Sequence, residues 1–278
     1  MTDKRGVAPD RQYAIDQLLR IMERLRDPEF GCPWDRKQDF RSIAPYTLEE
    51  CYELVDAIEQ DNLPHLADEL GDVLFQVVFY SQLGREIEAF DFNSVVDGIA
   101  RKLLRRHPHV FADGEIEGYV AREISTDEVK AAWEAIKGEE RASRAGAATR
   151  ILDDIPRALP ALPRAQKLQK RASNVGFDWQ SVDGVMDKLD EELTEFKQAL
   201  SDGAGDNIRE ELGDLMFSLV NVARHLGLDA ESVLRQANSK FEKRFNTMED
   251  SAARSGLSLD QESIEQLEAR WAHAKTAD

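Results

Sequence analysis

The same four acidic residues occur twice in this chain, 142 positions apart. Each set consists of two acidic pairs at i,i+3 spacing, which places both members of a pair on one face of a helix. A repeat of this length constrains the chain to two similar halves. Four carboxylates directed into one space are suited to a hard divalent cation. The two sets are Glu50, Glu53, Glu69 and Asp72, and Glu192, Glu195, Glu211 and Asp214.

Hydrophobic periodicity predicts that both halves are helical. Apolar residues follow a helical period from Leu189 to Leu200 and again from Leu212 to Leu226. In the first half we expect the matching helix over residues 47–60, and Pro64 falls where the first turn of the next helix should lie. Strand-like alternation is scarce. The expected fold is all-α, with an antiparallel helical hairpin in each half.

The repeat continues beyond the hairpins and indicates two domains. Lys102 and Arg106 correspond to Lys240 and Arg244, and Trp133 corresponds to Trp271, all at an offset of 138. Residues 138–154 are rich in Arg, Ala, Gly and Glu, which is typical of a linker. We therefore expect a first domain over residues 1–137, a linker over 138–154 and a second domain over 155–278.

Composition limits the partners and the compartment. A net charge of -18 at pH 7 repels polyanions, so we expect no nucleic-acid partner. No apolar stretch approaches the roughly 18 residues of a membrane span, so we expect no membrane partner. Two cysteines give no disulfide framework and suit a reducing, cytoplasmic location.

The residue types at the repeated acids favour Mg²⁺ or Mn²⁺. All proposed ligands are carboxylates, and neither Cys nor His joins them at ligand spacing. None of the five histidines has a Glu three residues before it, which argues against a di-iron bundle. The alternative is that these acids are solvated, as isolated Glu-x-x-Glu pairs usually are. Two copies at a fixed distance favour the metal hypothesis.

Basic residues beside the second acidic set indicate a phosphorylated substrate. Lys188 shares a helix face with Glu192 and Glu195, and Lys240 and Arg244 are i,i+4 neighbours. Cations beside a metal suit a ligand that carries several phosphates. The alternative is that they pair with nearby acids. Trp271 is a candidate surface for stacking a base, although a single helical tryptophan more often packs in a core.

Several motifs together resemble the MazG nucleoside triphosphate pyrophosphohydrolases. They are Gly31-Cys-Pro-Trp34-Asp35, Thr47-Leu-Glu-Glu-x-x-Glu53 with Glu69-Leu-Gly-Asp72, and the second Glu-Glu-x-x-Glu with Glu-Leu-Gly-Asp. The similarity extends to Arg106-His-Pro-His-Val-Phe111 and Asn174-Val-Gly-Phe-Asp-Trp179, and so covers nearly the whole chain.

The resemblance implies tandem domains of the all-α NTP pyrophosphatase type, a homodimer, and Mg²⁺-dependent hydrolysis of nucleoside triphosphates to monophosphate and pyrophosphate. It implies broad base tolerance and a role in clearing unwanted nucleotides. Where relatives can carry a lysine four residues before the second-hairpin Glu, this chain has Asn207. The implied metal ligands are Glu192, Glu195, Glu211 and Asp214, and the implied nucleotide contacts are Lys188, Lys240, Arg244 and Trp271.

The two copies differ beside their acids. Tyr46 stands at the position of Lys188, and Phe79 stands at the position of Asn221. The first hairpin therefore lacks a cation and carries an aromatic residue where the second has a polar one. We expect the second copy to be catalytic, with Asn221 at its substrate site. The first copy is expected to bind metal without turnover or to serve folding and dimerisation.

The expected mechanism is attack of a water molecule at the α-phosphorus, with pyrophosphate as the leaving group. Glu191 or Glu192 could accept the proton of the water, and the sequence does not distinguish them. Two alternatives stay open at this point. One is a pyrophosphatase that acts on a single nucleotide, and the other is a non-catalytic acidic module that binds metal or a basic protein.

Overall fold

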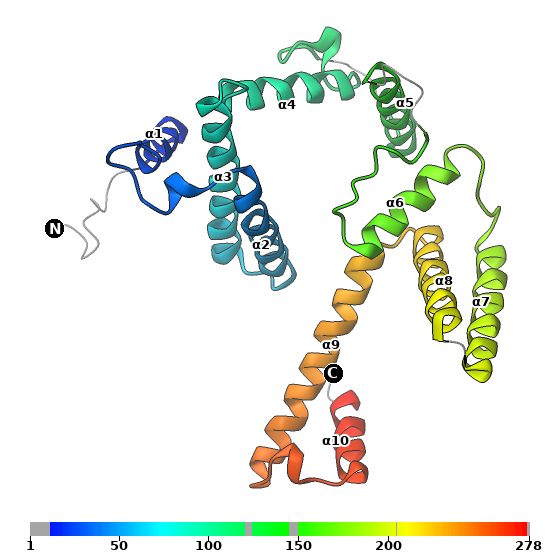
Figure 1. Cartoon of the computed structure of the whole chain (residues 1–278). Helices are drawn as coiled ribbons and strands as arrows, with labels where there is room; N and C mark the ends of the chain where they lie inside the picture. The colour runs from blue at the N-terminus through cyan, green and yellow to red at the C-terminus, as the bar shows by residue number, and fades with distance from the viewer. Residues whose placement is uncertain (1–11, 120–123, 145–149, 204, 277–278) are drawn as a thin grey trace. The chain divides into compact units, whose positions relative to one another are not determined.

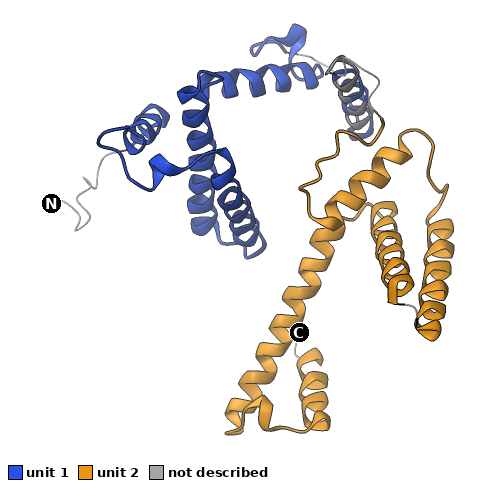
Figure 2. Cartoon of the chain, viewed as in Figure 1, with its two compact units in different colours: residues 1–144 blue, residues 145–278 orange. Residues whose placement is uncertain are grey.

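A computed structural model describes residues 12–119, 124–144, 150–203 and 205–276. Within these ranges the chain forms α-helices and short 3-10 turns and no strand, which confirms the all-α prediction. The chain divides into two compact units, residues 1–144 and 145–278 (Figure 2). In the described ranges no helix is both long and apolar enough to cross a bilayer.

Unit 1 is built around a hairpin of two long helices, as predicted. Asp39 caps the first of them by accepting hydrogen bonds from two backbone amides, so this helix begins at Phe40 and is longer than expected. Pro64 lies in the first turn of the second, where no backbone donor is needed. The unit contains α1 (Ile15–Leu25), α2 (Phe40–Glu59), α3 (Leu63–Glu86), α4 (Phe92–Arg106) and α5 (Thr126–Arg144) (Figure 1).

The core of unit 1 lies where α1, α2 and α3 meet. Phe79 is fully buried and is the largest side chain in this core. It packs edge-on against Phe75, and the guanidinium of Arg26 lies over its ring. The buried cluster consists of Met22, Ile43, Val78, Phe79 and Leu83.

Unit 2 repeats the hairpin with α7 and α8. Gly203 ends α7 in a left-handed conformation (φ 68°), which a residue with a side chain rarely adopts. The chain then reverses directly into α8, and α6 packs against both α8 and α9. The unit contains α6 (Ala161–Ser173), α7 (Val182–Asp202), α8 (Gly205–His225), α9 (Ala230–Arg254) and α10 (Ile264–Thr276).

The helices after each hairpin also repeat, but their lengths differ. The starts of α4 and α9 and the starts of α5 and α10 are each 138 positions apart. Pro108 follows the end of α4 closely, whereas α9 has Asn246 at that position and continues to Arg254. Residues 240–276, here called the arm, consist of the rest of α9 and α10, which stand away from α7 and α8 (Figure 1).

The structure describes the predicted linker at its start and at its end, where residues 151–154 form a turn. Residues 138–144 are the last seven of α5, and residues 145–149 lie outside the described residues. The division into units falls at 144/145, within the predicted 138–154 segment. The proposed boundaries, 1–137 and 155–278, thus differ from the compact units by a few residues on either side.

Candidate active site

The α7/α8 hairpin brings three of the four acids of the second set together. One oxygen each of Glu192, Glu211 and Asp214 lies within 4.8 Å of the others. Glu192 comes from α7 and is only 6% exposed, whereas the other two come from α8. Glu195, one turn after Glu192, is exposed and lies outside this group of three.

The negative charges of these carboxylates repel one another. Partial removal from solvent raises the pKa of Glu211, and the negative charges of Glu195, Glu192 and Asp214 raise it further. Glu195 therefore acts on the cluster from its rim. Carboxylate oxygens are the ligands that Mg²⁺ and Mn²⁺ prefer, so the donor set fits a hard divalent cation.

Lys188 forms ion pairs with two acids of α7, as in the alternative that the sequence leaves open for the basic residues. Its Nζ lies 2.8 Å from Glu192 Oε1 and 2.7 Å from Glu191 Oε1. The hydrogen bonds to Glu191 and Glu192 raise the pKa of Lys188 above its ordinary value, so the side chain stays charged. Glu191 is exposed and lies outside the group of three carboxylates. Its carboxylate is engaged by Lys188.

A pocket of about 410 Å³ opens beside the carboxylates. Its walls come from α6, α7, α8 and the segment between α6 and α7. Lys188, Glu192 and Asp214 are among its lining residues, and so is Asn221, which is almost fully buried. The rest is mainly apolar, with Leu152, Leu168, Ala172, Phe177, Trp179 and Phe217.

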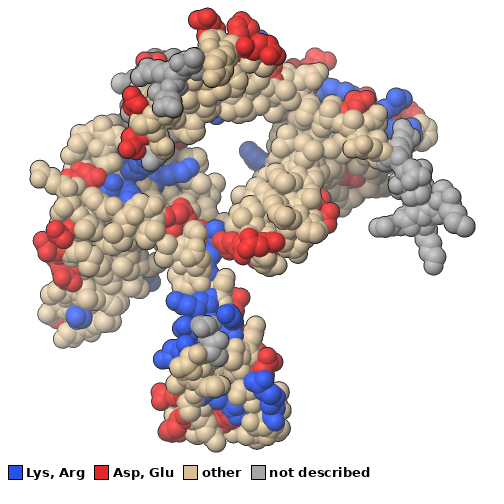
Figure 3. Space-filling view, turned by 180° about the vertical axis from the view of Figure 1, so that it is seen from behind, with Lys and Arg blue, Asp and Glu red and all other residues tan. Residues whose placement is uncertain are grey.

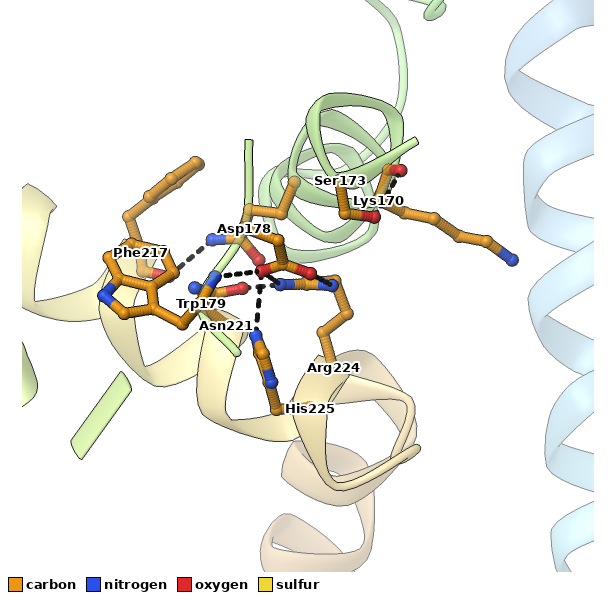
Figure 4. Close-up of polar contacts among 9 residues, drawn as sticks. Lys170, Ser173, Asp178, Trp179, Phe217, Asn221, Arg224 and His225 are labelled. Carbon is orange, nitrogen blue, oxygen red and sulfur yellow. Dashed lines mark hydrogen bonds and ion pairs between the residues drawn. The ribbon is translucent and has the colours of Figure 1, made fainter. Parts of the chain in front are cut away.

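Asp178 fixes the segment that carries two of these aromatic residues. It accepts hydrogen bonds from both terminal nitrogens of Arg224, from His225 Nε2 (2.9 Å) and from the backbone amide of Trp179 (3.0 Å) (Figure 4). The hydrogen bonds from Arg224 hold the pKa of Asp178 below its ordinary value. Arg224 also donates to Asn221 Oδ1 (2.8 Å), which joins this network to the wall of the pocket.

Trp179 packs against α7 at a glycine. A methyl group added at Gly184 would lie 2.7 Å from Cδ1 of Trp179, which is closer than van der Waals contact. Only a residue without a side chain leaves room for the indole here. Gly184 and Asp178 together therefore set the position of this pocket wall.

Sequence reasoning did not assign a role to several of these residues. Gln169 and Asp178 lie more than forty residues before Phe217 and Arg224, their respective partners on α8, so no single helical period links them. The available signal was the motif that ends at Trp179, which contains Asp178 and was noted without a function. Its function in the structure is to line and fix the pocket.

The first copy forms a similar cluster in a different setting. One oxygen each of Glu50, Glu69 and Asp72 lies within 4.8 Å of the others, and Glu53 lies outside this group. Burial and the charges of Asp72, Glu53 and Glu69 raise the pKa of Glu50. Glu69 Oε1 lies 2.8 Å from His65 Nε2, and His65 stands at the position of Asn207.

The residues at the positions of Asn221 and Lys188 have different surroundings in the first copy. Phe79, at the position of Asn221, fills the core of unit 1. Tyr46, at the position of Lys188, packs edge-on against Trp34 instead of contacting an acid. The acids of the first copy thus lack the lysine found in the second, and His65 is the residue that pairs with Glu69.

The remaining predicted substrate residues lie on the arm. Arg244 lies over the ring of Trp271, with 6.0 Å to the ring centroid, and Phe241 contacts the same ring at 5.3 Å between centroids. Lys240 is exposed on the same helix. Lys and Arg side chains gather along this part of α9 (Figure 3). Within one chain the arm that carries them stands away from α7 and α8 (Figure 1).

Comparisons with known proteins agree with the repeat. The model of the MazG nucleotide pyrophosphohydrolase domain matches residues 38–111 and 180–248. The nucleoside triphosphate pyrophosphohydrolase of Escherichia coli (strain K12) is 52% identical over 94% of this chain and 97% of that protein. The nucleoside triphosphate pyrophosphohydrolase/pyrophosphatase MazG of Thermotoga maritima is 44% identical over 95% and 96%. A crystal structure of a mazG-related protein from Thermotoga maritima covers 45% of this chain and 99% of that chain, with a TM-score of 0.37 and 25% identity.

Proposed function

Because the chain belongs to the MazG nucleotide pyrophosphohydrolase family and is an enzyme of that class, we propose that it hydrolyses nucleoside triphosphates to monophosphate and pyrophosphate at its second copy. One observation carries this assignment. Glu192, Glu211 and Asp214 converge to within 4.8 Å, and Glu192 and Asp214 line a pocket that is also lined by Lys188. A triphosphate placed there has a cation site, a lysine and an apolar wall within one cavity.

Mg²⁺ is the proposed cofactor, with Mn²⁺ as a substitute. Glu192, Glu211 and Asp214 would hold it, with Glu195 contributing from the rim. The bound ion supplies positive charge that stabilises the phosphate oxygens and makes a water molecule a better nucleophile. The raised pKa of Glu211 supports this assignment, because a cluster of mutually repelling carboxylates gains most from a divalent cation.

The chain's own residues would bind the phosphates and accept the proton. Lys188 would offset the negative charge of the phosphate chain. Proton acceptance is assigned to Glu192 or Glu191. Glu191 is exposed, and its Oε1 lies 2.7 Å from Lys188 Nζ.

Broad base tolerance is supported by the chemistry of the pocket. Leu168, Phe177, Trp179 and Phe217 offer apolar and aromatic surface, on which any base can stack. We propose a role in clearing unwanted nucleotides in the cytoplasm, with no nucleic-acid or membrane partner. An enzyme for a single nucleotide would instead require several polar groups aimed at one base.

A homodimer is proposed because each unit exposes a matching apolar row. Leu70, Leu74 and Val77 on α3 correspond at an offset of 142 to Leu212, Met216 and Leu219 on α8, and all six are exposed. Repeated apolar rows on the outer face of a hairpin are typical of helices that pack against another hairpin. A second copy of this chain supplies one for each.

The same dimer accounts for the distant arm. Lys240, Arg244 and Trp271 are the remaining predicted nucleotide contacts, and they stand away from the cluster of their own chain. We propose that the arm of one copy reaches the carboxylate cluster of the other. Its lysine and arginine would then meet the phosphates from the side opposite Lys188.

Product analysis in ¹⁸O-labelled water tests the proposed reaction. Hydrolysis at the α-phosphorus releases pyrophosphate and places the label in the nucleoside monophosphate. Label in pyrophosphate would place the attack at the β-phosphorus, and release of orthophosphate would contradict the reaction altogether. A panel of triphosphates measured with Mg²⁺, and again after chelation, tests base tolerance and metal dependence. No hydrolysis of any triphosphate would favour the metal- or protein-binding alternative.

A further inference from the structure

One polar atom in the pocket has no partner. Gln169 lies on α6, lines the pocket and is only 8% exposed. Its Nε2 donates a hydrogen bond to the backbone carbonyl of Phe217 (2.8 Å). Its Oε1 is buried and accepts no hydrogen bond from any of the described residues. Buried acceptors are normally satisfied, so this atom indicates a missing donor.

The orientation of the amide is fixed by its environment. Rotating the amide by 180° would place Oε1 against the carbonyl oxygen of Phe217, and two acceptors would face each other. Gln169 therefore presents an acceptor whose donor is not among the described residues.

A second glutamine on α6, Gln166, has a structural role and serves as a comparison. Gln166 donates from Nε2 to the carbonyl of Leu228 (2.8 Å) and accepts at Oε1 from the amide of Ala230 (3.0 Å). Both ends of this side chain are used to connect α6 to the start of α9. Gln169 uses only its donor in this way, and its acceptor is left beside the pocket.

We propose that Gln169 Oε1 accepts a hydrogen bond from an N–H group of the nucleobase. The proposal rests on the proposed function and places the base in the apolar part of the pocket, with the phosphates toward Lys188 and Glu192. Each common nucleobase carries an N–H donor on its pairing edge. A single buried acceptor therefore orients any base without selecting one, which is compatible with broad tolerance.

UTP provides the sharpest test, because uracil has one N–H donor, at N3. We compare kcat/KM for UTP and N3-methyl-UTP in the wild-type protein and in Gln169→Met, which keeps the length of the side chain and removes its polar atoms. In the wild type we expect methylation to lower kcat/KM by about tenfold. The kcat/KM of Gln169→Met for UTP should be lower than that of the wild type by a similar factor, mainly through a higher KM. Its kcat/KM values for the two substrates should agree within about twofold.

Other outcomes overturn the inference. If methylation acts only through its bulk, Gln169→Met will lose as much activity on methylation as the wild type does. If Gln169 is only structural, Gln169→Met will behave like Gln166→Met. Gln166→Met should lower the melting temperature without changing the ratio of kcat/KM between the two substrates. If the wild type hydrolyses no triphosphate, the proposed function fails. Wild-type hydrolysis without coupling to Gln169 contradicts this inference alone.

Discussion

Lys188 Nζ lies 2.8 Å from Glu192 Oε1, so the most buried carboxylate of the cluster is paired with a cation of the chain itself. A divalent ion that binds Glu192 has to share or displace this contact. The lysine that pairs with this carboxylate is thus also the residue proposed to contact the phosphates. Its two roles can be separated experimentally.

Lys188→Met should have opposite effects on metal and on nucleotide. Without the lysine, a divalent cation meets no competing or repelling charge, so the affinity for Mn²⁺ alone should rise. The KM for triphosphates should rise about tenfold or more, because a charge-assisted contact is lost. Calorimetric titration with Mn²⁺ and steady-state kinetics measure the two effects. Weaker Mn²⁺ binding in Lys188→Met would show that the lysine supports the metal site.

The repeat supplies a matched pair of variants for locating the active site. Glu192→Gln should lower pyrophosphate release by more than about 100-fold, because several kcal/mol of transition-state stabilisation depend on the metal. Glu50→Gln, at the equivalent position of the first copy, should keep activity within about twofold. Thermal melts of both variants control for folding. Equal losses would mean that both copies contribute to turnover.

Substitution of two helical glycines should give opposite results. Alanine in place of glycine usually stabilises a helix by up to about 1 kcal/mol, and Gly98→Ala should do so because nothing lies within 4 Å of the added methyl group. Gly184→Ala should lack this gain and raise the KM, because the methyl group displaces Trp179. Equal melting temperatures and equal KM values for the two variants would contradict the proposed position of the indole.

Asp178 should make stability depend on pH on the acid side. Its pKa is lower in the folded protein than the ordinary value of 3.8, chiefly because Arg224 donates to it. The folded state then binds fewer protons than the unfolded state, so this stabilisation is present above pH 3.8 and is lost as the pH falls through the lowered pKa. Asp178→Asn should be less stable than the wild type near neutral pH, and the difference should shrink on acidification. Chemical denaturation over a pH series measures it.

Mixed dimers test whether the arm acts on the partner's cluster. Glu192→Gln and Arg244→Ala should each be nearly inactive alone. After unfolding and refolding of an equal mixture, half of the dimers are mixed and carry one intact site, so activity should return to about one quarter of the wild type. The matched control mixes Glu192→Gln with Asp214→Asn, whose defects lie in the same cluster, and should recover nothing. Absence of recovery in the first mixture, in refolded dimers, would place the arm elsewhere.

The sequence predicted the fold and the acids because both depend on local periodicity. The i,i+3 spacing and Pro64 defined the hairpins, and the structure brings three acids of each set together. The sequence did not predict the roles of Gln169 and Asp178, because their partners on α8 are more than forty residues away and no helical period connects them. Arg244 was assigned by resemblance, and no rule of helix geometry states which chain's cluster it serves.

The burial of Phe79 makes the difference between the two halves hard to reverse. Tyr46→Lys would place a cation beside the acids of the first copy, but Phe79 would still stand where the second copy has Asn221. Removing its ring would leave a void in the buried cluster of unit 1 and cost roughly 3–5 kcal/mol. The stability of unit 1 therefore depends on the same residue that distinguishes its hairpin from the hairpin of unit 2.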